Sequence, residues 1–143
     1  MHMTALSNND LGPLRDVLTQ AGLPVDDLSY SGRQFFSFNH QGVDVGFAGI
    51  EGEGAERLLR SLVVLEGQRG RGAGVAVLAA VEAFARREGV ERLHLLTDSA
   101  AAFFTGQGYL PEDRSLAPAS ISATAQFKTL CPASATYLSK RLV

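Results

Sequence analysis

The stretches Leu62-Val63-Val64-Leu65 and Arg69-Gly70-Arg71-Gly72-Ala73-Gly74 decide the fold of this chain, because they predict a strand, a glycine-rich turn and the start of a helix. Glycine lacks a Cβ atom, so its backbone can adopt unusual angles and approach a ligand closely. The free N–H groups at the start of the following helix attract an anion, and the helix dipole favours negative charge there. The sequence here therefore predicts a binding site for a pyrophosphate group.

The spacing of the glycines distinguishes between three phosphate-binding motifs. The dinucleotide fingerprint requires a third glycine where Val75 or Val77 stands, and a P-loop requires a Gly-Lys pair that is absent near the turn. The pattern Arg-x-x-Gly-x-Gly fits from Arg69 to Gly74. A glycine-rich surface loop before an ordinary helix is the alternative interpretation.

Two helices and three antiparallel strands are expected before the glycine turn. The first helix has Asn9 or Asp10 as its N-cap and ends at Gly22, and a second short helix spans residues 24–28. Apolar runs separated by glycine-containing turns then predict strands over residues 34–38, 43–51 and 57–65.

After the glycine turn, the pattern alternates between helices and strands. Val75, Leu78 and Val81 belong to an apolar stripe at helical spacing, and Gly89 ends that helix. Residues 90–97 predict a buried strand, parallel to the strand before the turn because a helix connects the two. The remaining elements are a helix at 100–107, a strand from Tyr109, a connection at 113–132 with a helix at 120–130, and a strand at 135–142. The predicted fold class is α+β with a mixed, mostly antiparallel sheet.

Length and composition limit the class of protein. A chain of 143 residues with 45% apolar residues is typical of one globular domain, here residues 1–143. The net charge of −2 and the scattered basic residues argue against a nucleic-acid partner. No apolar run approaches the roughly 18 residues that cross a bilayer, and residues 1–3 are too short for a leader and are expected to be frayed. The single cysteine, Cys131, excludes an internal disulfide, so we expect a cytoplasmic protein without a membrane partner.

The Arg69–Gly74 turn resembles the acetyl-CoA signature of the GNAT N-acetyltransferase superfamily. The segment from Asp98 to Tyr109 resembles the second conserved segment of that superfamily, and the order of elements is similar over nearly the whole chain. The resemblance implies α/β/α layers around a central sheet and acetyl-CoA as co-substrate, with no metal.

A narrower resemblance connects the chain to the arsenic-resistance-associated GNAT acetyltransferases. Its most specific part is the C-terminal segment Phe127-Lys128-Thr129-Leu130-Cys131-Pro132-Ala133-Ser134-Ala135. The other matching segments are Ala48–Glu51, Leu59–Leu62, Leu95–Thr97 and Phe103-Phe104. This branch implies resistance to arsenic by acetylation of an amine on an arsenical compound, a detoxification reaction.

The superfamily resemblance implies direct attack of a primary amine on the thioester of acetyl-CoA. Its cofactor would be held by the backbone of Leu62, Val63 and Val64 along the pantetheine arm, with the Val64 N–H as donor to the oxyanion. The pyrophosphate would lie on Gln68, Arg69, Gly70, Arg71, Gly72, Ala73, Gly74 and Val75. Thr97, Phe103 and Phe104 complete the predicted cofactor set.

Two residues depart from the usual superfamily pattern. Many members have a tyrosine general acid where Phe104 stands and an asparagine where Thr97 stands. Phenylalanine has no proton to donate. The alternatives are that transfer needs no acid, because the CoA thiol leaves readily, or that a water molecule or Tyr109 serves.

Charged residues on the strands are the candidates for substrate chemistry. Glu51 is the candidate general base, and its alternative is a surface glutamate at a strand end. Arg60 is the candidate ligand for a substrate anion, and its alternative is a strand-edge salt bridge. Ser61 and Arg33 are further substrate-binding candidates, and Arg114 is a weaker one.

The sequence is therefore compatible with three functions. The first is an N-acetyltransferase for a small amine-bearing molecule, as a monomer or homodimer. The second is a CoA-binding regulatory or sensing module that lacks catalysis, and the third is an acetyltransferase for a protein N-terminus or lysine. The histidines His2, His40 and His94 lie too far apart in the predicted elements to predict a metal site, and Cys131 is expected to be a small buried residue before Pro132.

Overall fold

The computed structural model describes residues 1–143, and a seven-stranded sheet runs through its centre in the order β1-β2-β3-β4-β5-β7-β6. Every neighbouring pair is antiparallel except β4 and β5, which are parallel because a helix connects them. The strands are β1 (His2–Ala5), β2 (Arg33–His40), β3 (Val43–Glu51), β4 (Glu56–Val64), β5 (Arg92–Thr97), β6 (Leu110–Glu112) and β7 (Thr136–Arg141). The predicted mixed, mostly antiparallel sheet is confirmed.

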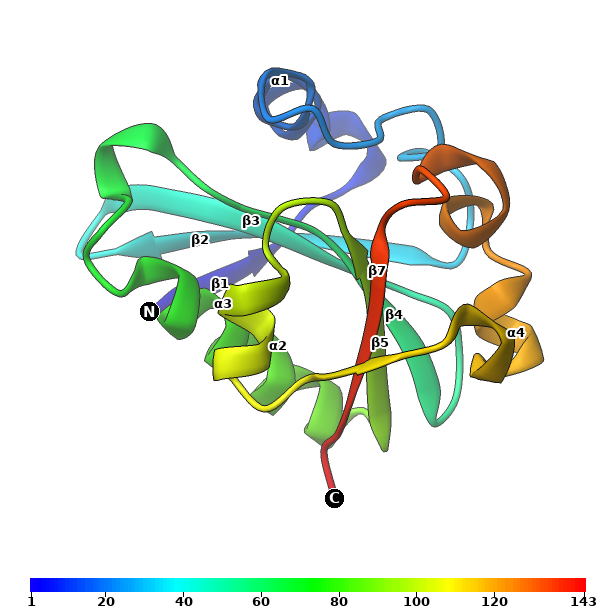
Figure 1. Cartoon of the computed structure of the whole chain (residues 1–143). Coiled ribbons are helices and arrows are strands. Elements are labelled where there is room, and N and C mark those ends of the chain that lie inside the picture. The colour runs from blue at the N-terminus through cyan, green and yellow to red at the C-terminus, as the bar shows by residue number, and fades with distance from the viewer.

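Helices cover both faces of this sheet, so the molecule has three layers (Figure 1). α1 (Gly12–Gln20) lies on one face, and α2 (Ala73–Arg87) and α3 (Ala101–Gly106) lie on the other. The short helical segments are η1 (Asn8–Asp10), η2 (Glu66–Gln68), η3 (Arg114–Leu116), α4 (Ala119–Ser122) and the π-helix η4 (Gln126–Leu130). None of these helices is both long and apolar enough to cross a membrane.

Two apolar cores follow from the alternation of side chains along β2. Phe36 and Phe38 belong to the larger core, which the apolar stripe of α2 completes with Val77, Leu78 and Val81. Phe35 points to the other face and packs in a smaller core with Leu14 and Leu18 of α1. The strand is therefore buried on both faces, which fixes its register between the two layers.

Three sequence predictions differ from the structure. Residues 1–3 were expected to be frayed, but His2–Ala5 form β1 and pair with β2. Most β1 side chains are exposed, so the sequence carries no apolar alternation there. Residues 24–28 form a loop rather than a helix, and the expected helix at 120–130 is divided into α4 and η4.

The parallel pairing of β4 with β5 is short, and this opens the sheet at its centre. Only residues Glu56, Arg57 and Leu58 of β4 pair with β5, opposite Arg92–His94. β4 continues for six more residues to Val64 and stays paired only with β3. The edge of β4 that faces β5 is therefore free along its second half.

Candidate active site

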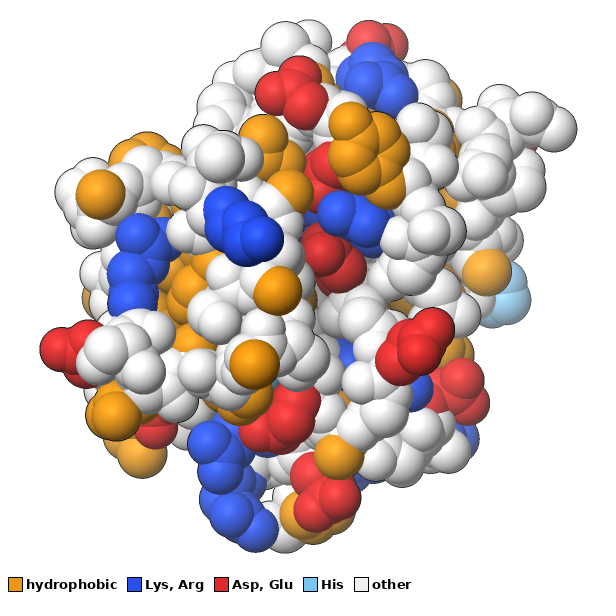
Figure 2. Space-filling model, turned by 90° about the vertical axis from the view of Figure 1, so that its right-hand side faces the viewer, with side chains coloured by type: hydrophobic (Ala, Val, Ile, Leu, Met, Phe, Trp, Pro, Cys, Tyr) orange, Lys and Arg blue, Asp and Glu red, His pale blue; other side chains and the backbone are white.

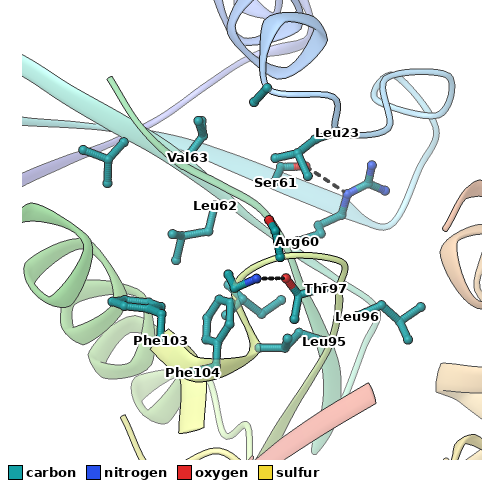
Figure 3. Close-up of a pocket in the computed structure, with 15 residues that line it drawn as sticks. Leu23, Arg60, Ser61, Leu62, Val63, Leu95, Leu96, Thr97, Phe103 and Phe104 are labelled. Carbon is teal, nitrogen blue, oxygen red and sulfur yellow. Dashed lines mark hydrogen bonds between the residues drawn. The ribbon is translucent and has the colours of Figure 1, made fainter. Parts of the chain in front are cut away.

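A cleft of about 260 Å³ lies where β4 and β5 separate. Most of its walls are apolar, and the polar groups on them come from Arg60, Ser61, Thr97 and Ser99 (Figure 3). The cleft brings together eight residues that the sequence singled out, namely Arg60, Ser61, Leu62, Val63, Val64, Thr97, Phe103 and Phe104. Two segments that are about 35 residues apart in the chain thus form one site.

A β-bulge shapes the β4 wall of this cleft. Phe47 pairs with Val63 while Gly49 pairs with Arg60, so β4 contains one extra residue between these pairs. Ser61 lies in the bulge with a φ of 58°, a left-handed conformation that is uncommon for a residue with a side chain. The bulge places the side chains of both Arg60 and Ser61 among the buried residues.

The backbone of Val64 borders the cleft. Leu65 N–H donates to the Val45 carbonyl of β3 at 2.8 Å, and successive residues of a strand turn their polar groups to opposite edges. The N–H of Val64 therefore lies on the free edge of β4. The Val64 carbonyl on that edge accepts a hydrogen bond from Arg69 Nε at 3.1 Å, which ties the glycine turn to the strand.

The glycine turn exposes a row of N–H groups. Gly70 and Gly72 have φ values of 80° and 74°, and Gly72 is the N-cap of α2. None of the N–H groups of residues 70–75 donates to a backbone carbonyl, and the first such bond in α2 is from Ala76 to Gly72. A Cβ at position 70 or 72 would meet no atom within 4 Å. The turn is thus an open cradle of donors, as an anion at a helix N-terminus requires.

Gly74 has a different role from the other two glycines. A Cβ at this position would lie 3.4 Å from the ring of Phe103 and 3.8 Å from Val64 Cγ2. The absence of a side chain allows the Phe103 ring of α3 to pack against the start of α2. Gly74 therefore sets the distance between the two helices rather than the shape of the cradle.

Phe104 is part of the apolar core as well as the cleft wall. Its ring lies edge-on to Phe103 at 5.1 Å and to Tyr109 at 5.5 Å. Thr97, at the position where asparagine is usual, accepts a hydrogen bond from the N–H of Ala100 at 3.0 Å and so caps the turn before α3. Neither side chain offers an acid to the cleft.

Tyr109, one of the alternatives for the general acid, lies outside the cleft. Its hydroxyl is fully buried and donates to Glu82 Oε2 at 2.9 Å, and Lys140 Nζ lies 3.0 Å from the other oxygen of Glu82. Burial and the charge of Glu82 raise the pKa of Tyr109 far above its ordinary value. The hydroxyl is a structural donor in the core between α2 and β7.

A buried network of two arginines and two carboxylates lies behind the β4 wall. Arg60 Nη1 and Nη2 bind the two oxygens of Asp27 at 2.6 and 2.7 Å, and Nη1 also lies 2.9 Å from Glu51 Oε1. Arg33 binds Asp27 through Nε at 3.1 Å and Nη2 at 2.9 Å, and Nη2 lies 3.3 Å from Glu51 Oε2. Two positive and two negative charges thus compensate one another inside the protein.

The network fixes the ionisation of Asp27 and Arg60. Burial alone would raise the pKa of Asp27, but the hydrogen bonds and charges of Arg60 and then Arg33 outweigh it, so this pKa lies below its ordinary value. For Arg60, burial works against the charge, yet Asp27 and then Glu51 raise the guanidinium pKa. Asp27 is the residue of this network that the sequence did not reveal, because it is separated from Arg60 by 33 residues.

Arg60 and Glu51 form one ion pair, whereas the sequence predicted a separate role for each. The Arg60 side chain is fully buried, and its Nε donates to Ser61 Oγ at 3.2 Å (Figure 3). Its other donors face the carboxylates of Asp27 and Glu51. Glu51 does not line the cleft, and each of its oxygens faces an arginine. Arg33 is likewise paired with Asp27 and Glu51 and lies outside the cleft.

Residues 31–111, more than half of the chain, match the family model of the acetyltransferase (GNAT) domain. The chain belongs to the GNAT acetyltransferase family. This assignment supports acetyl-CoA as the co-substrate of the chain. No curated protein matches the chain at a significant level of sequence similarity.

Solved structures share the fold of this GNAT chain at low sequence identity. N-acetylglutamate synthase from Neisseria gonorrhoeae, complexed with coenzyme A and N-acetyl-glutamate, matches with a TM-score of 0.77 and 18% identity over 100% of this chain and 36% of its own. Tetrahymena GCN5 matches with a TM-score of 0.79 and 14% identity over 100% of this chain and 97% of its own. An aminoglycoside 6'-N-acetyltransferase complexed with coenzyme A matches with a TM-score of 0.71 and 15% identity over 100% of this chain and 98% of its own. The chain thus spans about a third of the length of the first protein and nearly all of the other two.

A second cavity of about 350 Å³ adjoins the cleft of the GNAT chain. The two share Ala21, Leu23, Leu96, Thr97 and Ser99 in their walls. Asp98, Cys131 and the loop residues Gly22 and Pro24 line only the second cavity. Cys131, expected to be a small buried residue, is a partly exposed wall residue whose Sγ lies 3.7 Å from Gln126 Oε1.

The charged side chains outside the cleft form neither a continuous basic area in the view of Figure 2 nor a metal site. Basic and acidic side chains are interspersed over the face of the molecule in Figure 2, without a continuous basic area. No three His, Cys, Asp or Glu side chains lie close enough to hold a metal ion. Arg114 stacks over the ring of Phe127 at 5.4 Å and lines neither cavity.

Proposed function

We propose that the protein transfers the acetyl group of acetyl-CoA to the primary amine of a small molecule. The observation that carries the proposal is the separation of β4 from β5, which leaves a free strand edge leading to an open cradle of N–H groups. The pyrophosphate would lie on residues 70–75 and the pantetheine arm along Leu62–Val64. The exposed Arg71 beside the cradle would add a charge-assisted contact.

The reaction follows from the groups that border the cleft. The amine nitrogen attacks the carbonyl carbon of the thioester, the carbon–sulfur bond breaks, and CoA leaves as the thiolate. The Val64 N–H would donate to the oxyanion that forms during attack. A thiol with a pKa of about 8.5 is a good leaving group, so Phe104 need only shield the thioester from water. The ammonium form of the amine gives one proton to water before the attack, and the nitrogen releases a second proton to water as the amide forms.

Within this proposal, Glu51 and Arg60 act together as positioning residues. Both Glu51 oxygens face arginines, so direct proton removal by this carboxylate is less well supported than a role in holding Arg60. Arg60 in turn binds Ser61 Oγ at the bulge, which sets the direction of the β4 edge. The network thus holds the Val64 N–H in position. It does not contact a substrate anion, which is the role that the sequence suggested for Arg60.

For the acceptor, we propose an amino-acid-like molecule that carries arsenic. The resemblance of Phe127–Ala135 to the arsenic-resistance-associated GNAT acetyltransferases supports this choice. Ala135 and Leu130–Pro132 of that segment line the second cavity, where an acceptor would enter. An acetyltransferase for proteins is less well supported, because the two cavities together suit a small molecule.

The second candidate function is a CoA-binding sensing module, which Phe104 at the usual position of the acid favours. One experiment separates the two functions: the purified protein is incubated with acetyl-CoA and single acceptors, and free thiol and acetylated product are measured. The acceptors are amino acids, amino phosphonates and amine-bearing arsenicals. Thiol release with stoichiometric N-acetylated product supports the transferase, and the arsenical should be the best acceptor. Tight CoA binding without any product would support the sensing module.

A further inference from the structure

We propose that Asp98 binds the ammonium group of the acceptor in the second cavity and thereby favours acceptors that carry an ammonium group over neutral amines. The inference rests on the proposed acetyl transfer and names the acceptor's binding residue. The location of Asp98, its negative charge and its free carboxylate oxygens support this role.

Asp98 is the only carboxylate that lines either cavity, and it has no partner. Asp27 and Glu51 are each bound by both Arg33 and Arg60. Asp98 is exposed and forms no hydrogen bond or ion pair with any other residue. The oxygens of Asp98 are therefore free to accept hydrogen bonds from an ammonium group, whereas those of the buried Asp27 and Glu51 already accept from arginines.

The walls of the second cavity favour a cation. Asp98 is the only charged residue among them, and the others are apolar or neutral polar residues. The charge of Asp98 also acts on the Cys131 thiol in this wall: burial raises the pKa of that thiol, the charges of Arg114 and Arg60 lower it, and those of Asp98 and Asp27 raise it to a smaller extent. A carboxylate in a partly enclosed apolar cavity attracts a cation more strongly than it would in bulk water.

The location connects Asp98 to the reacting end of acetyl-CoA. Asp98 follows Thr97, which lines both cavities, and Leu96 and Thr97 lie on the side of the cleft away from Phe103 (Figure 3). An acceptor held at Asp98 would enter the cleft past Thr97 and Ser99 and meet the thioester between β4 and β5. The ammonium group bound by Asp98 can be the reacting amine before it loses its proton, or a second amine on the acceptor.

The test compares acceptors that differ in charge. Aliphatic monoamines and diamines are cations at neutral pH, and aromatic amines are neutral. We expect Asp98→Asn to raise KM for aliphatic amines about tenfold or more, with KM for acetyl-CoA and for aromatic amines unchanged. Asp98→Glu should restore part of the loss, and added salt should raise the wild-type KM for aliphatic amines only. A larger effect on diamines than on monoamines would assign the contact to a second amine.

The matched control is Asp44→Asn, which removes the charge of another exposed, unpaired aspartate that lines neither cavity. Equal effects of Asp98→Asn on aliphatic and aromatic amines, or no effect at all, would overturn the inference. Calorimetric titration of the CoA complex with the amines tests binding at Asp98 separately from the proposed acetyl transfer. Amine binding that depends on Asp98 without any acetylation would leave the inference standing and refute the transferase. Absence of both binding and acetylation would refute both.

Discussion

Replacement of Asp27 by asparagine tests the buried network that supports the active-site bulge. Asp27 is only 1% exposed and accepts four hydrogen bonds, of which three from Arg60 and Arg33 converge on Oδ2. In Asp27→Asn the shape is kept, but the amide NH₂ must face a guanidinium donor of Arg60. The change therefore removes the charge and sets two donors against each other in a buried site.

The loss of stability in Asp27→Asn follows from the burial of this site and from the ion pairs that remain in the variant. Breaking a buried ion pair by removing one partner costs about 3–5 kcal/mol. Glu51 still pairs with both arginines, so we expect about 3 kcal/mol, near the lower limit of that range. Against a total stability of about 5–15 kcal/mol, this would lower the melting temperature by about 10 °C.

The assay is chemical denaturation followed by circular dichroism, with Asp26→Asn as the control. Asp26 is the exposed neighbour on the same loop and forms no hydrogen bond or ion pair, so its replacement should cost less than about 0.5 kcal/mol. Equal stabilities of the two variants would refute the reasoning, because they would show that the Asp27–Arg60 pair contributes no more than a surface charge.

The same residue predicts how stability depends on pH. The pKa of Asp27 is lower in the folded protein than its ordinary value of 3.8, so the unfolded chain binds the proton more readily. The stabilising contribution of Asp27 is therefore complete above that ordinary value and is lost as the pH falls below it, through the folded pKa. Below about pH 4 the wild-type protein should lose stability more steeply than Asp27→Asn, and parallel pH curves would contradict this.

Three further variants test the cleft. Gly72→Val places a branched side chain at a φ of 74° in the space where the phosphate approaches, so CoA affinity measured by calorimetry should fall at least about tenfold, while Gly67→Ala, outside the cradle, should bind normally. Phe104→Tyr should change kcat by less than about tenfold, and a larger acceleration would show that protonation of the thiolate limits the reaction. Glu51→Gln should lower kcat less than about a hundredfold and leave the acidic limb of the pH–rate profile unchanged, whereas a larger loss with a flattened limb would make Glu51 the general base.

Local patterns predicted the part of the site that is built from neighbouring residues. The apolar run at Leu62–Leu65, the glycine turn and the stripe of α2 lie next to one another in the chain. Their order alone therefore indicates a strand that leads into a donor-lined helix start. Gly89 likewise marks the end of α2, where its φ of 82° favours a residue without a Cβ.

Features that depend on distant residues were not predictable in the same way. The Asp27–Arg60 pair joins a loop to a strand across 33 residues, and no periodicity relates the two positions. The bulge at Ser61 carries a left-handed φ on a residue that is not glycine, so no composition signal marks it. β1 is an edge strand with mostly exposed side chains, and its pairing with β2 rests on backbone hydrogen bonds that every sequence can form.

The destination of the acetyl group tests the central claim most directly. Acetyl-CoA labelled with a heavy isotope in its acetyl group is mixed with the protein and one amine acceptor, and nuclear magnetic resonance follows the labelled carbonyl. The proposed function predicts that the label moves from the thioester to an amide on the acceptor, at a rate that Gly72→Val strongly reduces. Label that stays on CoA, or that appears only as free acetate, would contradict acetyl transfer to an amine.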